Sequence, residues 1–173
     1  MRQIFYRIGQ FRRAFRELPT AEGLAQAKAA LEPGLFALFM RMLPFEQAHS
    51  IRVFDQLLQQ GYSHPDLLQA ALLHDVGKSR HPLQPWQRAV SVVAEKFFPG
   101  RIARWGQRQP GRLLLGVVVS EQHAGWGAEM AKAAGAGDLV VRLIANHQKY
   151  SLSQLPGEEQ RLLRALQAVD KVS

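Results

Sequence analysis

The sequence predicts an all-α protein, and three of its features support this fold class. Apolar residues recur at three- and four-residue spacing in most segments, which is the period of an amphipathic helix. Glycine and proline lie between these segments, where helices are expected to end. Hydrophobic residues make up 47% of the 173 residues and charged residues 21%, a globular composition that fits one domain with a core of its own.

Two helices are expected before residue 45. Residues 1–18 predict a basic amphipathic helix, in which arginines separate apolar residues at helical spacing. The apolar residues are Ile4, Phe5, Ile8, Phe11 and Phe15, and the arginines are Arg2, Arg7, Arg12, Arg13 and Arg16. Such a helix can lie on an anionic membrane, but it more often packs on its own domain. A second helix is expected over 22–42 and ends near Pro44.

The next two helices contain the first unusual ionisable residues. The helix over about 45–60 carries one stripe of apolar residues that also holds a histidine, namely Phe45, His49, Val53 and Leu57. The following helix starts near residue 65, where Ser63 and Asp66 have capping-box spacing. It is apolar along most of its length, and Gly77 marks its end.

The segment 79–112 is strongly basic, with seven Lys and Arg residues opposed only by Glu95. Proline and glycine divide it, and short helices are expected over 86–98 and 101–107. We interpret the segment as a basic insertion or lid that gates a pocket for an anionic substrate, with Arg101 and Arg104 as candidate substrate-binding residues. The alternative is a surface segment whose charges face solvent, where screening leaves each of them little effect.

The last third of the chain is also predicted to be helical. The apolar run 113–119 is rich in β-branched residues, which would suit a strand. Because no neighbouring segment shows strand signals, we expect a buried helix there. Further helices are predicted over about 125–134, 138–147 and 157–170, separated by glycine- and proline-containing turns at 135–137 and 155–157.

The net charge of +8 favours anionic partners: a phosphorylated small molecule, nucleic acid or an anionic membrane. No nucleic-acid motif accompanies this charge, so an anionic small-molecule substrate is preferred. Cysteine is absent, which excludes thiolate ligands and thiolate nucleophiles. The sequence shows no signal peptide and no apolar run of about 18 residues, so a soluble cytoplasmic protein is expected.

Six ionisable residues among apolar neighbours indicate a shared metal. His74 and Asp75 end an apolar helix, where burial of an imidazole and a carboxylate costs free energy unless a cation or a hydrogen-bonded partner compensates. The other four are His49, His123, His147 and Asp170. Each alone is more often a structural residue, but together they are hard to explain without a common partner. Imidazole and carboxylate donors without thiolate suit Fe, Mn, Zn, Ni or Mg.

The same residues resemble the pattern of the HD superfamily. His49, the pair His74–Asp75 and Asp170 match its H…HD…D order, and the string ALLHDVGK at 71–78 resembles its HD(I/V)GK segment. His123 and His147 match the two extra histidines of HD-GYP-like and other dinuclear members. The resemblance covers about 45–170. It implies a single HD-domain helical bundle over 1–173, with N-terminal helices at 1–44 and the metal-site core at 45–173.

The resemblance also implies roles for these residues. A first divalent ion would be held by His49, His74, Asp75 and Asp170, and Asp75 would bridge to a second ion held by His123 and His147. One or two divalent transition-metal ions are thus expected as cofactor. Asp75 and Lys78 are the candidate catalytic residues, and Lys78 would meet a phosphate oxygen of the substrate. The alternative for Lys78 is a cation at a helix C-terminus, stabilised by the helix dipole.

Metal-dependent phosphohydrolysis of a phosphate ester or nucleotide, through a metal-activated water, is the activity that the resemblance favours. HD-GYP phosphodiesterases carry His-Glu and then a GYP segment after the last histidine. This chain has Gln148-Lys149-Tyr150 instead, which argues against cyclic di-GMP as substrate. Two alternatives stay open. One is diiron oxygenase chemistry, since myo-inositol oxygenase has a similar layout, and the other is a non-catalytic, metal-stabilised interaction or signalling module.

Overall fold

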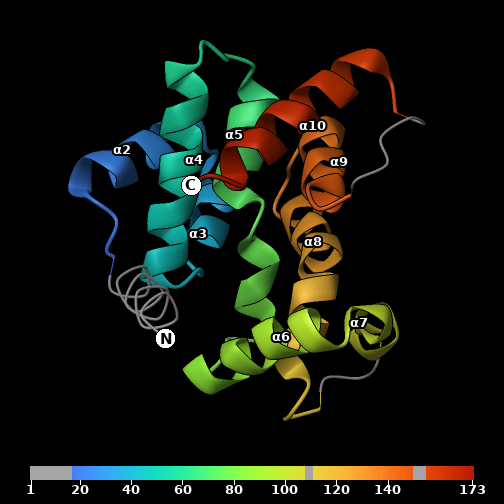
Figure 1. Cartoon of the computed structure of the whole chain (residues 1–173). Helices are drawn as coiled ribbons and strands as arrows, with labels where there is room; N and C mark the ends of the chain where they lie inside the picture. Colours follow the sequence, from blue (N-terminus) through green and yellow to red (C-terminus); the bar gives the residue numbers. More distant parts are fainter. Residues whose placement is uncertain (1–16, 108–110, 150–154) are drawn as a thin grey trace.

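The structure, a computed structural model, describes residues 17–107, 111–149 and 155–173, and in these ranges every regular element is a helix (Figure 1). The elements are α2 (Ala21–Ala30), α3 (Pro33–Phe39), α4 (Pro44–Gln59), α5 (Pro65–Leu73), the 3-10 helix η1 (Val76–Arg80), α6 (Pro85–Phe97), α7 (Pro99–Gly106), α8 (Leu115–Ala133), α9 (Asp138–Asn146) and α10 (Gly157–Asp170). The predicted all-α class is confirmed. The basic helix expected over 1–18 lies outside the described residues, apart from its last two positions. No described helix combines the length and apolarity needed to cross a membrane.

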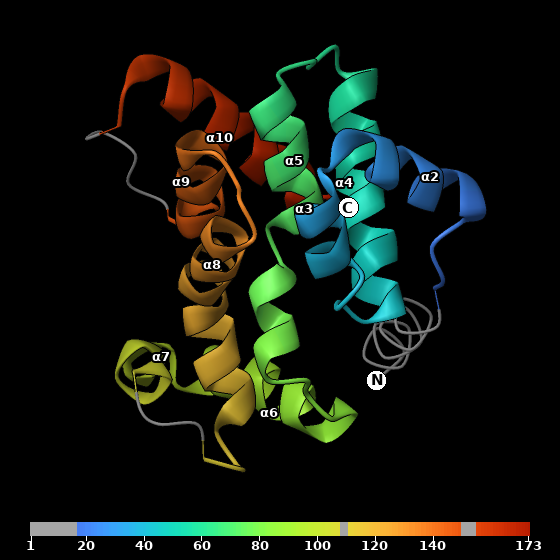
Figure 2. The same cartoon turned by 180° about the vertical axis from the view of Figure 1, so that it is seen from behind.

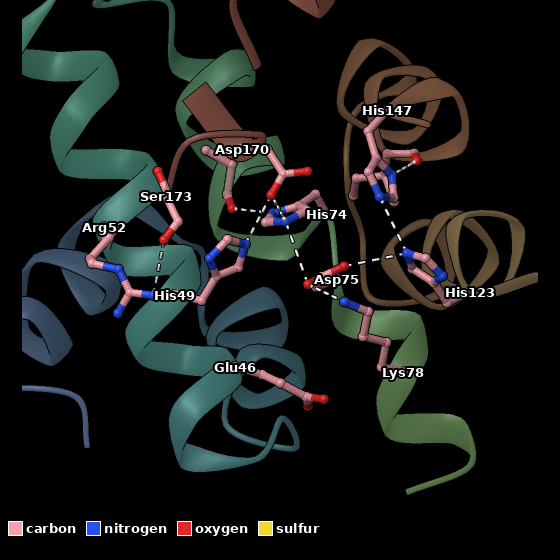
Figure 3. A network of polar contacts seen from close by, with 12 residues as sticks. Glu46, His49, Arg52, His74, Asp75, Lys78, His123, His147, Asp170 and Ser173 are labelled. Atoms are coloured by element: carbon pink, nitrogen blue, oxygen red, sulfur yellow. Dashed lines mark hydrogen bonds and ion pairs between the residues drawn. The ribbon is translucent and has the colours of Figure 1, made fainter. Parts of the chain in front are cut away.

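The main core surrounds α5, which runs between α4 and α9 (Figure 1, Figure 2). Leu67, Leu72 and Leu73 of α5 are fully buried, because apolar residues cover most of the circumference of this short helix. Helix α10 lies across α4, α5 and α9 and covers this core. The C-terminal ends of α5, α9 and α10 therefore meet beside the middle of α4 (Figure 3).

Helices α6 and α7 pack against α8 at the end of the molecule away from α10 (Figure 2). Ala94, Ile102 and Val117 form a small core of their own there, with Trp105 and Leu114 partly buried against it. The two short helices predicted within 79–112 are thus confirmed. The segment that contains them rests on α8 through apolar contacts as well as carrying charge.

The single helix expected over 22–42 is wrong, because two helices, α2 and α3, occupy this range. Leu31 and Glu32 lie between these two helices, and their ψ angles of 134° and 154° are those of extended backbone. The physical reason is Pro33: a proline disfavours the helical conformation of the residue before it and cannot donate a helix hydrogen bond. Pro33 instead starts α3 in its first turn.

Two other expected helix boundaries differ from the structure. The expectation of two separate helices over 113–119 and 125–134 is wrong, because the single helix α8 continues from one range into the other. No glycine or proline interrupts 117–124, and α8 accommodates the glycines at 125 and 127. The expected cap is also wrong, because His64 rather than Ser63 caps α5. Its Nδ1 accepts a hydrogen bond of 3.2 Å from the backbone N–H of Asp66.

Candidate metal centre

All six predicted metal ligands lie together at the junction of five helices (Figure 3). His49 lies in the middle of α4 and His123 in α8. The other four lie at helix C-terminal ends: His74 and Asp75 directly follow α5, His147 directly follows α9, and Asp170 is the last residue of α10. At such an end, consecutive side chains are not held to the 100° separation of a regular helix, so both members of the His74–Asp75 pair reach the centre.

The first group of ligand atoms comes from His49, His74 and Asp170, all within 4.8 Å of one another. Asp170 Oδ1 lies 2.9 Å from Nε2 of His49 and 3.3 Å from Nε2 of His74. One carboxylate oxygen thus faces two imidazole nitrogens. These atoms could hold a metal ion with mixed nitrogen and oxygen ligands.

The second group comes from Asp75, His123 and His147, which are all buried. Asp75 Oδ1 lies 3.3 Å from Nε2 of His123, and the Nε2 atoms of His123 and His147 lie 3.3 Å apart. The other oxygen of Asp75, Oδ2, lies 3.6 Å from Nε2 of His74 in the first group. Asp75 therefore stands between the two groups, with one carboxylate oxygen toward each.

Backbone carbonyls hold three of the four histidines in one orientation. Nδ1 of His74 lies 2.8 Å from the carbonyl oxygen of Ala71, and Nδ1 of His147 lies 2.7 Å from that of Ile144. Nδ1 of His123 lies 2.9 Å from the carbonyl oxygen of Val119 and 3.0 Å from that of Ser120. Because a carbonyl oxygen only accepts, each Nδ1 must carry the hydrogen. In the neutral ring the lone pair is then on Nε2, which points into the centre.

These orientations fit a cation. The facing Nε2 atoms of His123 and His147 both present lone pairs when neutral, a repulsive arrangement unless a proton or a metal ion lies between them. Nε2 of His74 is buried and makes no well-aligned hydrogen bond, but it faces a carboxylate oxygen of Asp170 at 3.3 Å and one of Asp75 at 3.6 Å. A buried nitrogen between two carboxylates is stabilised by a positive charge, which either a proton or a metal ion can supply. Imidazole nitrogens and carboxylate oxygens suit a divalent transition metal.

The electrostatics of the centre favour positive charge between the carboxylates. Burial by itself lowers the pKa of His74, but the carboxylates of Asp75 and Asp170 raise this pKa to about 9. Burial opposes ionisation of Asp75, yet Lys78 and His74 hold the pKa of its carboxyl well below its usual range. Burial and the neighbouring His74 lower the pKa of His147 to about 3. A bound cation supplies the charge that the proton on His74 otherwise provides.

Lys78 faces the same centre from η1. Its Nζ donates to Asp75 Oδ2 at 2.5 Å, and its side chain is partly exposed. With Arg88 and Ser120 it lines a pocket of about 200 Å³ that is bordered by His123. Arg88 was not among the substrate-binding residues expected from the sequence, which were Lys78, Arg101 and Arg104. No local sequence pattern in α6 distinguishes Arg88 from the other arginines of 79–112.

The structure does not bring the other two candidate substrate residues to this pocket. Arg101 and Arg104 are exposed on α7, and neither lines the pocket beside His123. Helix α7 packs against α6 and α8. The part of 79–112 that reaches the centre is therefore α6, through Arg88.

Gly77 lies within η1, at the point where η1 contacts α8 directly. It does not mark the end of the preceding helix as expected, because α5 already ends at Leu73. A Cβ at this position would stand 1.9 Å from the carbonyl oxygen of His123 and 2.6 Å from the backbone nitrogen of Gly127. No side chain fits in that space. The close approach holds Asp75 and Lys78, on either side of Gly77, opposite His123.

The comparison with protein families agrees with this centre. The family model of the HD domain matches residues 47–173, a range that contains all six residues of the two ligand groups. Neither the comparison with curated proteins nor the comparison with solved structures yields a match. Since the family model covers well over half of the chain, the chain belongs to the HD-domain family.

Proposed function

We propose that this protein is a metal-dependent phosphohydrolase that acts on a phosphate ester or a nucleotide. HD domains are in general metal-dependent hydrolases, and the chain is a member of that family. The observation that supports the proposal most is the position of Asp75, between two groups of ligand atoms and beside a pocket lined by two cationic side chains.

Each side chain of the centre has its own role in this proposal. His49, His74 and Asp170 would hold one ion, His123 and His147 a second, and Asp75 would bridge them. A divalent metal, when bound, lowers the pKa of a coordinated water and neutralises negative charge on phosphoryl oxygens. Lys78 would donate to a phosphoryl oxygen, since its ammonium group lies between Asp75 and the pocket.

A phosphatase screen of protein loaded with Mn²⁺, Fe²⁺ or Ni²⁺ tests the activity. We expect phosphate release from at least one class of phosphate ester or nucleotide. Asp75→Ala should lose metal and reduce turnover by more than about 100-fold, because losing even an outer-shell partner of a metal ligand costs 10- to 100-fold. Asp138→Ala, which removes an exposed carboxylate at the start of α9, is the matched control and should retain both.

Elemental analysis tests the two-ion part of the proposal. We expect about two ions per chain under anaerobic, metal-replete conditions. Replacing both His123 and His147 by Ala should leave about one ion, because the group of His49, His74 and Asp170 stays intact. A wild-type content of one ion would contradict a dinuclear centre.

An oxygen-consumption assay, added to the phosphatase screen and the elemental analysis, separates the alternatives. Oxygen consumption by the iron-loaded protein without phosphate release would replace the proposal by oxygenase chemistry. Stoichiometric metal without either activity, across the full screen, would indicate a metal-stabilised binding module.

A further inference from the structure

We infer that Arg88, positioned by the buried Glu46, forms with Lys78 a binding site for a phosphate group of the substrate, beside His123. This inference rests on the proposed function, because it names the residues that would hold the phosphate during hydrolysis. It also gives α6 a specific role, which differs from the general basic lid expected from the sequence.

The pocket beside His123 has the size and chemistry for a phosphate group. Its volume is about 200 Å³, and η1, α6 and α8 all contribute to its walls. Among the residues that the structure describes, Lys78 and Arg88 are its cationic side chains, and Ser91, Ser120 and Gln148 add polar atoms. Among the described residues that line it there is no aspartate or glutamate; the carboxylates that pair with Lys78 and Arg88, those of Asp75 and Glu46, are not among the lining residues. An anion is the ligand that such walls attract.

Arg88 is held in a defined position, unlike an arginine on the surface. Its Nη2 donates to Glu46 Oε1 at 3.0 Å, and its guanidinium stands 4.9 Å from the centre of the Phe45 ring. The Glu46 side chain is only 3% exposed, and its other oxygen accepts from the backbone N–H of Leu43 at 3.1 Å. Because the guanidinium is already oriented, less conformational entropy is lost when it binds an anion.

The backbone that carries Arg88 is equally well fixed. The carbonyl of the preceding residue, Gln87, approaches Gly116 of α8 so closely that a Cβ there would stand 2.2 Å from its oxygen. The Gln87 side chain also donates to the carbonyl of Arg112 and accepts from the backbone N–H of Gln84. The start of α6 is therefore attached to α8, and the pocket between them is already formed.

A purely structural role explains the Arg88–Glu46 pair less well. A buried ion pair pays a desolvation penalty that two apolar side chains would avoid, so it is weak evidence for a stabilising contact. The pair joins α4 to α6 at a position where Arg88 also lines a pocket next to a predicted metal ligand. Charged side chains that line a cleft raise the local concentration of an oppositely charged ligand.

Calorimetric titration of the full-length, Mn²⁺-loaded protein with inorganic phosphate tests the inference without relying on catalysis. Arg88→Ala should weaken phosphate binding by about 10- to 100-fold, the usual effect of losing a charged hydrogen bond. Arg88→Lys should weaken it as well, since an ammonium group cannot donate two parallel hydrogen bonds. The Mn²⁺ content of both variants should equal that of the wild type.

Glu46→Gln tests the positioning role. It keeps the side-chain length but removes the negative charge that orients Arg88, so phosphate should bind several-fold more weakly while the metal content stays constant. Arg41→Ala removes an exposed charge outside the pocket and is the matched control, with binding within about twofold of the wild type. A thermal melt of each variant reports whether it is folded. If Arg88→Ala does not fold, Arg88→Lys provides the result.

Three results would overturn the inference: no phosphate binding by the wild type, folded Arg88 variants that bind as tightly as the wild type, or equal losses in Arg101→Ala and Arg104→Ala. The last result would mean that the overall positive field of 79–112 attracts the anion. A failure of the proposed function looks different. In that case phosphate binding still depends on Arg88, but no variant and no wild-type protein hydrolyses a phosphate ester.

Discussion

At the scale of single residues, the candidate ligands also complete the helices from which they come. His74 and His147 each follow the last residue of a helix, and each donates Nδ1–H to a carbonyl three residues earlier. Carbonyls at a helix C-terminus lack partners within the helix. One hydrogen bond therefore satisfies a helix end and fixes the tautomer that presents Nε2 to a metal.

We expect metal binding at pH 7 to release about one proton, because the ion replaces the proton of His74, whose pKa lies at about 9 in the metal-free centre. His147, with a pKa of about 3, carries no proton to release near neutrality. Below pH 9 the proton on His74 competes with the metal, so affinity should rise with pH, by roughly tenfold per unit. Titrations of Mn²⁺ at pH 6 to 8, in buffers of different ionisation enthalpy, measure both quantities. An affinity that stays constant over this range would contradict the assignment.

At the scale of elements, the short 3-10 helix η1 sets the position of Asp75 relative to His123 within the second ligand group. It begins directly after Asp75, contains Lys78, and lies on α8 where the latter carries His123. At Gly77 its contact with α8 is made through backbone atoms, since this position has no room for a side chain. The distance between Asp75 and His123 is thus determined by how closely two helices approach.

Gly77→Ala should destabilise the protein by at least about 1–3 kcal/mol, the range for overpacked sites, because its Cβ would overlap the carbonyl of His123. Moving η1 away from α8 should also weaken metal binding. Gly125→Ala is the matched control: this helical glycine of α8 has open space around it, and alanine should stabilise the helix by up to about 1 kcal/mol. Urea denaturation measures both effects. Equal stability of the two variants would show that the close approach is absent in solution.

At the scale of the whole molecule, the centre joins helices that are distant in the sequence. His49 and Asp170, 121 positions apart, lie 2.9 Å from each other. The residues after α10 support this contact, because the Ser173 hydroxyl donates to Gln56 of α4 at 2.9 Å and Arg52 donates to the Ser173 carbonyl at 3.5 Å. Metal ions held by the two groups, with Asp75 between them, would hold α4, α5, α8, α9 and α10 together.

Removal of the metal should therefore lower the stability of the whole fold. A ligand that binds only the folded state stabilises it by about 2.7 kcal/mol at a concentration 100 times its Kd. For a chain of this length that corresponds to a decrease in Tm of about 5–10 °C on chelation. Thermal melts with and without EDTA measure the change, and Asp75→Ala should show little response. An unchanged Tm for the metal-loaded wild type would contradict metal binding at this junction.

The sequence by itself determined the all-α class, most of the helices and the family, because these depend on local information. Helical period, glycine and proline positions, and the string around His74 and Asp75 can all be read within one or two turns. The errors were also local. The single helix expected over 22–42 leaves out the effect of Pro33 on the residue before it, and residues 120–124 fall between two expected helices although α8 continues through them.

Only the tertiary structure decided which oxygen of Asp75 faces which ligand group, and which arginine of 79–112 reaches the pocket. Arg88 meets Glu46 across 42 positions of sequence, and Gly77 meets His123 across 46. Such contacts depend on how α4, α6, η1 and α8 pack against one another. The seven basic residues of this segment are equivalent by charge. Of those that the structure describes, Arg88 is the one that helix packing places in the pocket beside His123.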